Sequence, residues 1–309
     1  MNKTTKDIPK RIFALAGGGL GDIYYSCLVG DWTYFEDIKE KSPDTKIHAV
    51  MSCTNSLGIE FPKYNPYIDR LEDKQEKDRN GCPLTDFMGE GYVRLSGAIT
   101  RHLEKRDGLF LGDEDKRFMA ETNKKLGNKY IVLHPFSGDM RRGRRPIPEG
   151  NTASRFVLPI DEYYPLVDKL IGLGYKVVVV GGNKPNTPSY EKQEYFDYQP
   201  AGLVNLIDQV NSRTAAALIK NASGWVGTYS CYCAIAWWSK IRTVLTAPIG
   251  THRGNETWEE KINTWPRWGW AAKQPQNMII YLPPICEVTD AQRYKDARKK
   301  MYDWFKEGK

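Results

Sequence analysis

The sequence predicts an α/β protein with two doubly wound, mostly parallel domains that face a cleft. Two observations carry this prediction. Short β-branched runs alternate with helical segments along most of the chain, which is typical of parallel sheets flanked by helices. The same plan also begins twice, at Arg11 and at Tyr130, each time as an apolar strand that ends in a loop of small residues. We therefore expect an N-terminal domain over 1–127 and a C-terminal domain over 128–309, whose last helix packs back towards the N-terminal domain.

The composition is that of a soluble globular protein: 40% of the 309 residues are hydrophobic and 27% are charged. No apolar run approaches the ~20 residues that span a membrane. The apolar stretch near the start, 12–16, is shorter than the ~7–15 residues of a signal-peptide core. We therefore expect a cytoplasmic protein. The net charge of +7 favours anionic partners such as a nucleotide sugar, an anionic glycolipid or a nucleic acid.

The six cysteines are scattered along the chain, and none forms a CxxC pair. Cys231 and Cys233 alone do not make a metal site, because a structural zinc needs four ligands. We expect reduced, mostly buried thiols. The pattern excludes a disulfide scaffold, and it gives no reason to expect a bound metal.

The N-terminal domain begins with a β-loop-α-β pattern. Residues 42–44, Ser-Pro-Asp, end its first helix because proline does not continue a helix. The expected elements are, in order, a strand over 11–16, a helix over 23–38, a strand over 46–51, a short helix over 56–61, a turn over 64–69 that leads to a strand, a polar loop over 72–83, and mostly helix over 92–126 with an acidic turn near 112–113.

The C-terminal domain repeats the alternation of strands and helices. Asp161 is expected to cap its first helix, and Gly174 to end it. The expected elements are a strand over 130–133, a helix over 163–173, strands over 176–180 and 203–206, a helix over 214–220, a strand over 224–227, a helix over 229–238, a strand over 242–246 and an amphipathic helix over 290–306.

The loop after the strand at 130–133 is rich in arginine. It carries Ser137 and Gly138, and then four arginines between 141 and 145. Guanidinium groups bind phosphate oxygens two at a time, so a strand that ends in such a loop suits an anion. The alternative is a solvated basic loop. The position of this loop, at the start of a second α/β unit, favours the phosphate interpretation.

The loop after the first strand reads GGGLGD over 17–22. Glycines such as Gly19 and Gly21 let a ligand approach the backbone closely. The dinucleotide fingerprint GxGxxG is not met, because Asp22 stands where the third glycine belongs. Asp22 either caps the following helix or serves as a carboxylate base that points into the cleft.

A third motif, GTYSCY over 227–232, lies between an expected strand and an expected helix. Thr228 and Ser230 could cap this helix. The same hydroxyls and free amides could hold a diphosphate at the positive end of the helix. Both roles are compatible, since the anion would take the place of a cap.

These motifs together resemble the heptosyltransferase-like family of GT-B glycosyltransferases. The resemblance rests, in chain order, on GGLGDI, NPYID, IVLHPFSG, PIDEYYPLVDKLIGLGYKVVVVGG and ASGWVGTYS…AIAWWSKIRTVLTAP, and it spans about 11–248. It implies two Rossmann-like domains, with the acceptor on the N-terminal one and the nucleotide sugar on the C-terminal one. It also implies inverting transfer to an acceptor hydroxyl without a metal or other cofactor.

The resemblance assigns residues to roles. Asp22 matches the catalytic base. The donor diphosphate would be bound by Ser137, Gly138, Arg141, Thr228, Tyr229 and Ser230. Further donor or acceptor contacts would come from Gly19, Gly21, Arg142, Arg155, Gly182, Val210, Tyr232 and His252. The nucleotide base would meet the stretch 208–211.

The donor-sugar turn departs from the family pattern. The family has an aspartate, a glycine and a histidine where this chain has Gly227, Tyr229 and Tyr232, whereas Thr228 is kept. The hexosyl, heptosyl or pentosyl type of the transferase is therefore left open, as are the nucleotide and the oligomeric state.

Two acceptors and two other functions remain open. The acceptor is a bacterial surface glycan or lipid-linked sugar, or a hydroxylated DNA base as in phage-type DNA modification. The protein would then act in the cytoplasm, at the inner face of the membrane, or as a phage-encoded protein in the host cytoplasm. The alternative functions are a nucleotide-cofactor oxidoreductase and a non-catalytic nucleic-acid-binding protein.

Two further groups of residues invite interpretation. Trp258, Trp265, Trp268 and Trp270 do not follow a regular helix face, and they would stack on a sugar or base, close the core, or form an oligomer contact. His252 and its neighbour Arg253 are expected on a loop near the cleft. His134 is expected to be structural, at a strand end.

Overall fold

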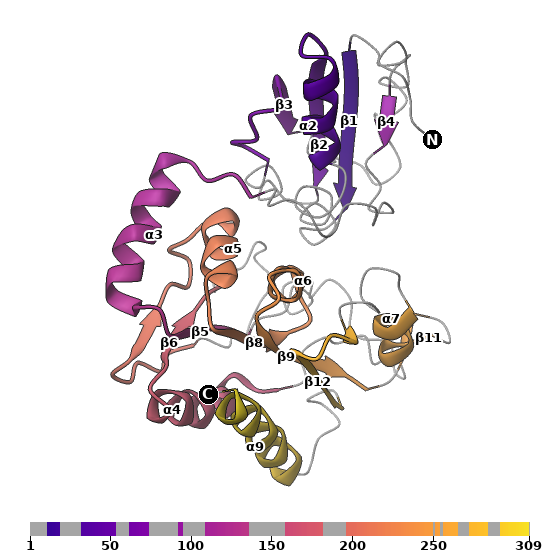
Figure 1. The fold of residues 1–309 in the computed structure, drawn as a ribbon. Helices are drawn as coiled ribbons and strands as arrows, with labels where there is room; N and C mark the ends of the chain where they lie inside the picture. Colours follow the sequence, from indigo (N-terminus) through magenta and orange to yellow (C-terminus); the bar gives the residue numbers. More distant parts are fainter. Residues whose placement is uncertain are drawn as a thin grey trace, which may run out of the picture. The chain divides into compact units, whose positions relative to one another are not determined.

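A computed structural model describes most of the chain (Figure 1). The chain divides into two compact units, Met1–Arg117 with Asn211–Arg213, and Phe118–Val210 with Thr214–Lys309. Each unit is described by itself below. The described residues are 11–18, 32–53, 62–73, 92–94, 109–135, 158–181, 196–249, 251–253, 256–264, 272–283 and 291–308.

The first unit contains a parallel sheet with strand order β3-β2-β1-β4. Its strands are β1 (Arg11–Gly18), β2 (Lys46–Cys53), β3 (Arg70–Asp73) and β4 (Tyr92–Arg94). The apolar residues Phe35 and Ile38 of helix α2 (Trp32–Lys41) are buried. The parallel pairing of β1 with β2, with α2 between them in the chain, confirms the predicted strand-helix-strand order. The predicted loop and the first part of the predicted helix, over 19–31, lie outside the described residues.

Strand β4 corrects the prediction that 92–126 is mostly helix. Tyr92–Arg94 pairs in parallel with β1, with Phe13 opposite Tyr92. Three residues are too few to show a period, so only the distant partner strand decides their structure. Helix α3 (Asp113–Leu126) begins at the acidic turn, where carboxylates favour a helix N-terminus, and ends before Gly127, whose φ is 68°.

The second unit contains a six-stranded parallel sheet with strand order β12-β9-β8-β5-β6-β7. Counted from β5, the chain first adds strands on one side and then on the other. The order therefore reverses between β5 and β8, as in doubly wound sheets. The strands are β5 (Tyr130–His134), β6 (Lys176–Val179), β7 (Leu203–Asn205), β8 (Gly224–Thr228), β9 (Arg242–Pro248) and β12 (Asn277–Leu282).

Helices cover both faces of this sheet. Helices α4 (Tyr164–Gly172) and α9 (Ala291–Glu307) lie on one face, and α5 (Ser212–Lys220) and α6 (Cys231–Trp238) on the other (Figure 1). All five residues of β5 are buried, as expected for a parallel strand covered on both faces. The predicted α/β class with parallel sheets is thus confirmed.

The terminal helix α9 belongs to the second unit. It packs on α4, and Phe305 is buried against Gly224 of β8, where a side chain would collide with the Phe305 ring. Burial of a side chain of this size contributes about 1.5–3 kcal/mol. The helix was predicted, and its contact with α4 lies within the second unit. That it packs back towards the N-terminal domain stays a prediction.

The start of α4 differs from the prediction. A short 3-10 helix over Ile160–Tyr163 precedes it, and no side chain caps either helix. Asp161 is therefore not the expected cap, because it lies inside the 3-10 turn. Gly174 ends the helix as predicted, with a φ of 82°.

The segment after β9 holds structure that the sequence did not indicate. Strand β12 pairs in parallel with β9. His252 lies in a hairpin of β10 (Thr251–Arg253) and β11 (Glu256–Thr257), so the predicted loop there is wrong. Trp258 begins helix α7 (Trp258–Thr264), and the other three tryptophans of the cluster lie outside the described residues. No helix in the described part of the chain is long and apolar enough to span a bilayer.

Candidate functional site

The carboxyl ends of β5 and β8 form the best candidate site in the second unit. In open α/β sheets, ligands bind where the strand order reverses, beyond the carboxyl ends of the strands. His134, the last residue of β5, lies opposite Gly227 of β8. In the sequence, β5 is followed by the segment that carries the arginines, which lies outside the described residues, and β8 is followed by the turn Tyr229–Ser230, which enters α6. The two motifs that are predicted to bind an anion thus follow adjacent strands at the reversal point.

Gly227 is required by the close approach of β5 and β8. A Cβ atom at this position would collide with the backbone carbonyl of His134 and approach the Trp225 indole to 2.7 Å. The family that this chain resembles has an aspartate here. In this sheet no side chain fits at that position, so the replacement of the family's aspartate by Gly227 has a steric reason.

A chain of buried hydroxyl groups braces the end of β8. The Thr246 hydroxyl donates to the Gly227 carbonyl over 3.2 Å, and the Tyr163 hydroxyl in turn donates to Thr246 over 3.3 Å. Burial raises the pKa of Tyr163, so its phenol stays protonated and can donate. Thr228 is itself fully buried. Sequence reasoning missed Tyr163 and Thr246, since they are distant in sequence and carry no motif.

Ser230 occupies the position before the first residue of α6 without capping it. Its backbone is extended, and its side chain makes no capping hydrogen bond. The Ser230 Oγ is buried and has no partner among the described residues. The first amides of a helix also lack intrahelical partners, and the helix dipole makes this end positive. A buried hydroxyl and a helix N-terminus therefore meet at the reversal point, an arrangement suited to an anion.

Tyr232 and His134 form an aromatic contact beside this turn. Their rings meet edge to face, with centroids 4.6 Å apart. The His134 Nδ1 donates to the Val180 carbonyl over 3.0 Å, because a carbonyl can only accept. This bond fixes the ring at the strand end, in agreement with the structural role expected from the sequence.

The loop after β7 lies at the same edge of the sheet. Asp208 adopts a left-handed conformation with a φ of 58°, and its N–H donates to the Gly181 carbonyl over 3.0 Å. Val210 follows and is half-buried. Because all strands are parallel, this loop and the Thr228–Ser230 turn both follow carboxyl ends.

Most of the other predicted site residues lie outside the described residues. Strand β1 ends at Gly18, immediately before the loop with the predicted base. His252 is placed by its backbone in β10, and its donor contact stays a prediction. The residues outside the description are Gly19, Gly21, Asp22, Ser137, Gly138, Arg141, Arg142, Arg155 and Gly182. Within the described ranges, no group of three or more His, Cys, Asp or Glu side chains could hold a metal ion.

No family model and no curated protein matches this chain. Solved structures do. The E. coli ADP-heptose LPS heptosyltransferase II aligns with a TM-score of 0.55 and 11% identity, over 96% of this chain and 99% of that chain. A glycosyl transferase family 9 protein from Veillonella parvula aligns with a TM-score of 0.52 and 12% identity, over 94% and 89%.

A third structure, the E. coli heptosyltransferase WaaC with ADP-2-deoxy-2-fluoro heptose, aligns with a TM-score of 0.50 and 11% identity. The alignment covers 94% of this chain and 99% of that chain. At such identities the likeness concerns the fold. The resemblance that the motifs indicate is confirmed at that level: this chain has the α/β fold of the heptosyltransferase-like glycosyltransferases.

Proposed function

We propose that this protein is an inverting, metal-independent glycosyltransferase that moves a sugar from a nucleotide-diphosphate sugar to an acceptor hydroxyl. The observation that carries the proposal is the buried hydroxyl of Ser230 at the N-terminus of α6, which has no partner within the described part of the chain. It lies where the strand order reverses, in a chain with the heptosyltransferase fold. A diphosphate oxygen would supply the missing acceptor for this hydroxyl.

The donor diphosphate would be bound from two sides. The turn after β8 offers Thr228, Tyr229 and Ser230, and the loop after β5 offers Ser137, Gly138 and Arg141. As the bond between the anomeric carbon and the phosphate oxygen breaks, that oxygen takes the electron pair. Guanidinium and amide groups stabilise the new charge and so serve in place of a metal ion.

Asp22 would act as the general base. The acceptor oxygen forms a bond to the anomeric carbon from the face opposite the leaving group, and its proton passes to the Asp22 carboxylate. One displacement of this kind inverts the configuration. Asp22→Asn should lower transfer by about 10²–10⁴-fold while nucleotide binding is unchanged. Turnover at the wild-type rate in that variant would remove Asp22 from the mechanism.

The donor is expected to be a nucleotide sugar other than ADP-heptose. The family's aspartate and histidine are replaced here by Gly227, beside which no side chain fits, and by Tyr232, which packs on His134. Polar contacts to the sugar hydroxyls would therefore be replaced by the aromatic ring of Tyr232, on which a sugar ring can stack.

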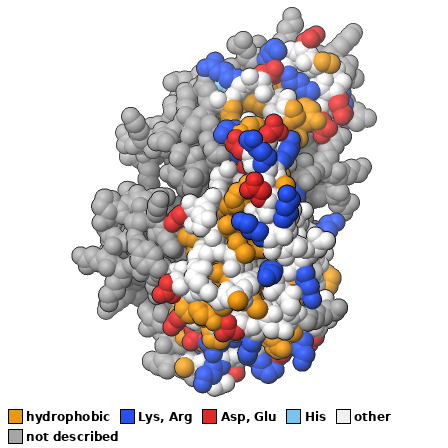
Figure 2. Space-filling model, turned by 90° about the vertical axis from the view of Figure 1, so that its left-hand side faces the viewer, with side chains coloured by type: hydrophobic (Ala, Val, Ile, Leu, Met, Phe, Trp, Pro, Cys, Tyr) orange, Lys and Arg blue, Asp and Glu red, His pale blue; other side chains and the backbone are white. Residues whose placement is uncertain are grey.

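The acceptor is proposed to be a bacterial surface glycan or lipid-linked sugar, with a hydroxylated DNA base as the other candidate. Among the described residues on the face drawn in Figure 2, basic side chains are interspersed with acidic and apolar ones. Duplex DNA binding depends on many phosphate contacts and weakens steeply with salt. Transfer assays with both acceptors at low and moderate salt discriminate between them.

A thermal-shift panel tests the donor. The wild-type protein is heated with ADP-, UDP-, GDP- and CDP-linked sugars and with the free diphosphates, in the presence of EDTA. Binding at 100 times Kd should stabilise the fold by about 2.7 kcal/mol. A rise with one nucleotide family supports the proposal and names the donor. A shift with NAD(H) alone, or with DNA alone, would favour an oxidoreductase or a nucleic-acid-binding protein instead.

A further inference from the structure

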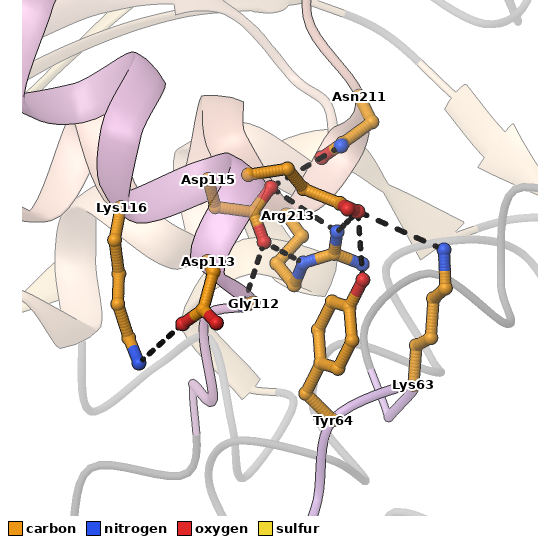
Figure 3. A network of polar contacts seen from close by, with 9 residues as sticks. Lys63, Tyr64, Gly112, Asp113, Asp115, Lys116, Asn211 and Arg213 are labelled. Carbon is orange, nitrogen blue, oxygen red and sulfur yellow. Dashed lines mark hydrogen bonds and ion pairs between the residues drawn. The ribbon is translucent and has the colours of Figure 1, made fainter.

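A fully buried arginine lies at the start of α5. Arg213 is 0% exposed, and its guanidinium binds both oxygens of Asp115, which is 1% exposed (Figure 3). The Nε donates to Oδ2 over 2.5 Å, and Nη2 donates to Oδ1 over 3.1 Å. Two parallel bonds fix the angle as well as the distance between the two side chains.

The surrounding side chains hold this ion pair in one geometry. Asp115 is the third residue of α3 and also accepts the Gly112 N–H over 2.9 Å. The Arg213 guanidinium lies 4.5 Å from the centre of the Tyr64 ring, and the Tyr64 hydroxyl donates to Glu114 over 2.7 Å. No side chain fits at Gly112, because the Tyr64 ring occupies that space.

The pair also holds the end of the loop after β7. The Asn211 side-chain amide donates to Asp115 Oδ1 over 3.3 Å (Figure 3). Asn211 is the last residue before α5, and the loop runs from Asn205 to Asn211. The Asp115 carboxylate thus accepts hydrogen bonds from Gly112, Arg213 and Asn211.

The loop over 205–211 is braced by hydrogen bonds along its length. Its Leu206 N–H donates to Val179 over 2.9 Å, and its Ile207 N–H donates to the Asn205 side chain over 3.0 Å. Asp208, exposed and left-handed, lies between these bonds and Asn211. A non-glycine residue stays in this conformation only when its surroundings impose it, and such residues cluster at ligand-binding positions.

Stability alone is a poor reason for a buried ion pair. Removing both charges from water offsets much of their attraction, so apolar side chains of similar volume often stabilise a fold as well or better. What a bidentate pair provides is a fixed geometry. Here the fixed geometry is that of Asn211, at the ligand-binding edge of a parallel sheet.

We propose that Arg213 and Asp115 are positioning residues that, through Asn211, set the 205–211 loop for the nucleoside end of the donor. This inference rests on the proposed function. From a diphosphate at β5 and β8, the nucleoside extends towards one side of the sheet edge. The β7 side offers the exposed polar Asp208, whereas β9 is followed by Ile249, which is apolar and 51% exposed. Ribose hydroxyls and base amides match the polar side.

Asn211→Ala tests the proposal, because it removes the link to Asp115 and leaves the ion pair intact. The Kd for the nucleoside diphosphate that the wild type binds should rise about tenfold, whereas the Kd for inorganic pyrophosphate should not change. Asn221→Ala is the matched control. It removes one side-chain hydrogen bond, 2.8 Å to the Ala217 carbonyl, at the other end of the same helix, and should change neither Kd.

A second variant and a second readout separate positioning from folding. Arg213→Lys keeps the charge but loses the two-pronged contact, so it should show the same selective loss of nucleoside binding. Amide hydrogen exchange in the ligand-free protein should accelerate about tenfold at Asp208 in Asn211→Ala, and stay unchanged in β5.

Three outcomes would overturn the proposal. Nucleoside diphosphate binding at the wild-type level in Asn211→Ala would show that the hydrogen bond from Asn211 to Asp115 does not position the loop for the nucleoside. An equal loss of pyrophosphate binding would show that Asn211 has a general structural role. Unchanged exchange at Asp208 would show that Asn211 does not order the 205–211 loop. If the wild type itself binds neither nucleoside diphosphate nor pyrophosphate, the proposed function fails first and this inference falls with it.

Discussion

Two polar regions of this molecule stand in contrast. At the start of α3, the Asp115 carboxylate accepts hydrogen bonds from three residues in two segments of the chain, Gly112 and the segment Asn211–Arg213. At the start of α6, the Ser230 hydroxyl is buried and has no partner among the described residues. Buried polar groups are normally satisfied, so an exception calls for an explanation. We infer that the Asp115 site holds the protein's own geometry, and we propose that the Ser230 site binds a ligand.

The largest effect is expected at the Asp115 site. Asp115→Ala removes both bonds between the buried Arg213 guanidinium and Asp115 and leaves a longer contact to the exposed Glu114, 3.4 Å from Nη2. The free energy of unfolding should therefore fall by about 3–5 kcal/mol, measured by urea denaturation. Asp113→Ala is the control from the same helical turn. Its carboxylate is 91% exposed and pairs with Lys116 over 3.4 Å, so water screens the interaction and the loss should be far smaller. Equal losses of unfolding free energy in Asp115→Ala and Asp113→Ala would show that the buried ion pair contributes no more to stability than the exposed one.

The next effect concerns the backbone of the Ser230 site. Gly227→Ala forces a methyl group against the His134 carbonyl, so β5 and β8 must separate, and unfolding should become easier by about 1–3 kcal/mol. Donor binding should weaken as well, since the turn after β8 moves. In Gly172→Ala, by contrast, the added methyl group meets nothing within 4 Å at the end of α4. That control should leave stability unchanged or raise it by up to about 1 kcal/mol.

A third test sets the two regions directly against each other. Ser230→Ala removes a buried hydroxyl that has no hydrogen-bond partner in the described ranges, so the ligand-free protein should lose no stability. Donor binding, measured by titration calorimetry, should weaken by about 1.5 kcal/mol, which is about tenfold, because one bond to a charged phosphate is lost.

Ser239→Ala supplies the reverse case. The Ser239 hydroxyl already donates to the Ile235 carbonyl over 2.7 Å at the other end of α6. Its removal should cost about 0.5–1.5 kcal/mol of stability and leave donor binding unchanged. A loss of ligand-free stability in Ser230→Ala with unaltered binding would mean that the hydroxyl serves the fold.

The contrast also marks what sequence could predict. Strands β5, β6, β8 and β9 were predicted because buried parallel strands are continuous apolar runs, such as Val177–Val180. The turn at Thr228–Ser230 was placed by its position between a strand and a helix. Strand β4 was missed, because its structure depends on pairing with a strand almost eighty residues away and not on its own pattern.

The details of both polar regions could not be predicted. Asp115 and Arg213 are separated by 98 positions, and neither belongs to a motif. Whether Ser230 caps α6 depends on its side-chain direction, since serine is a good cap at most helix starts. Nor does the sequence show that Gly227 faces the His134 carbonyl, because this requires the register of β5 on β8.

The smallest effect is expected at Asp69, which lies between the two extremes. Its side chain is 28% exposed and partnered by Lys39, Lys46 and the Ile47 N–H. Desolvation raises its pKa, but the hydrogen bonds from Lys39, the Ile47 N–H and Lys46 outweigh this and lower the pKa to about 2. Because the folded-state pKa lies below the unfolded one, of about 3.9, the stabilisation is complete above pH 4 and is lost as the pH falls towards 2.

Asp69→Asn should therefore remove a small acid-dependent component of stability between pH 4 and 2 and nothing above it, as followed by thermal unfolding across this range. Partial exposure keeps the contribution modest, because water screens an ion pair of this kind. If the wild type and Asp69→Asn lost stability in parallel as the pH fell, the carboxylate would gain nothing from its three donors. Satisfied hydrogen bonds would then be no measure of stabilisation at the surface, and the contrast between Asp115 and Ser230 would depend on burial alone.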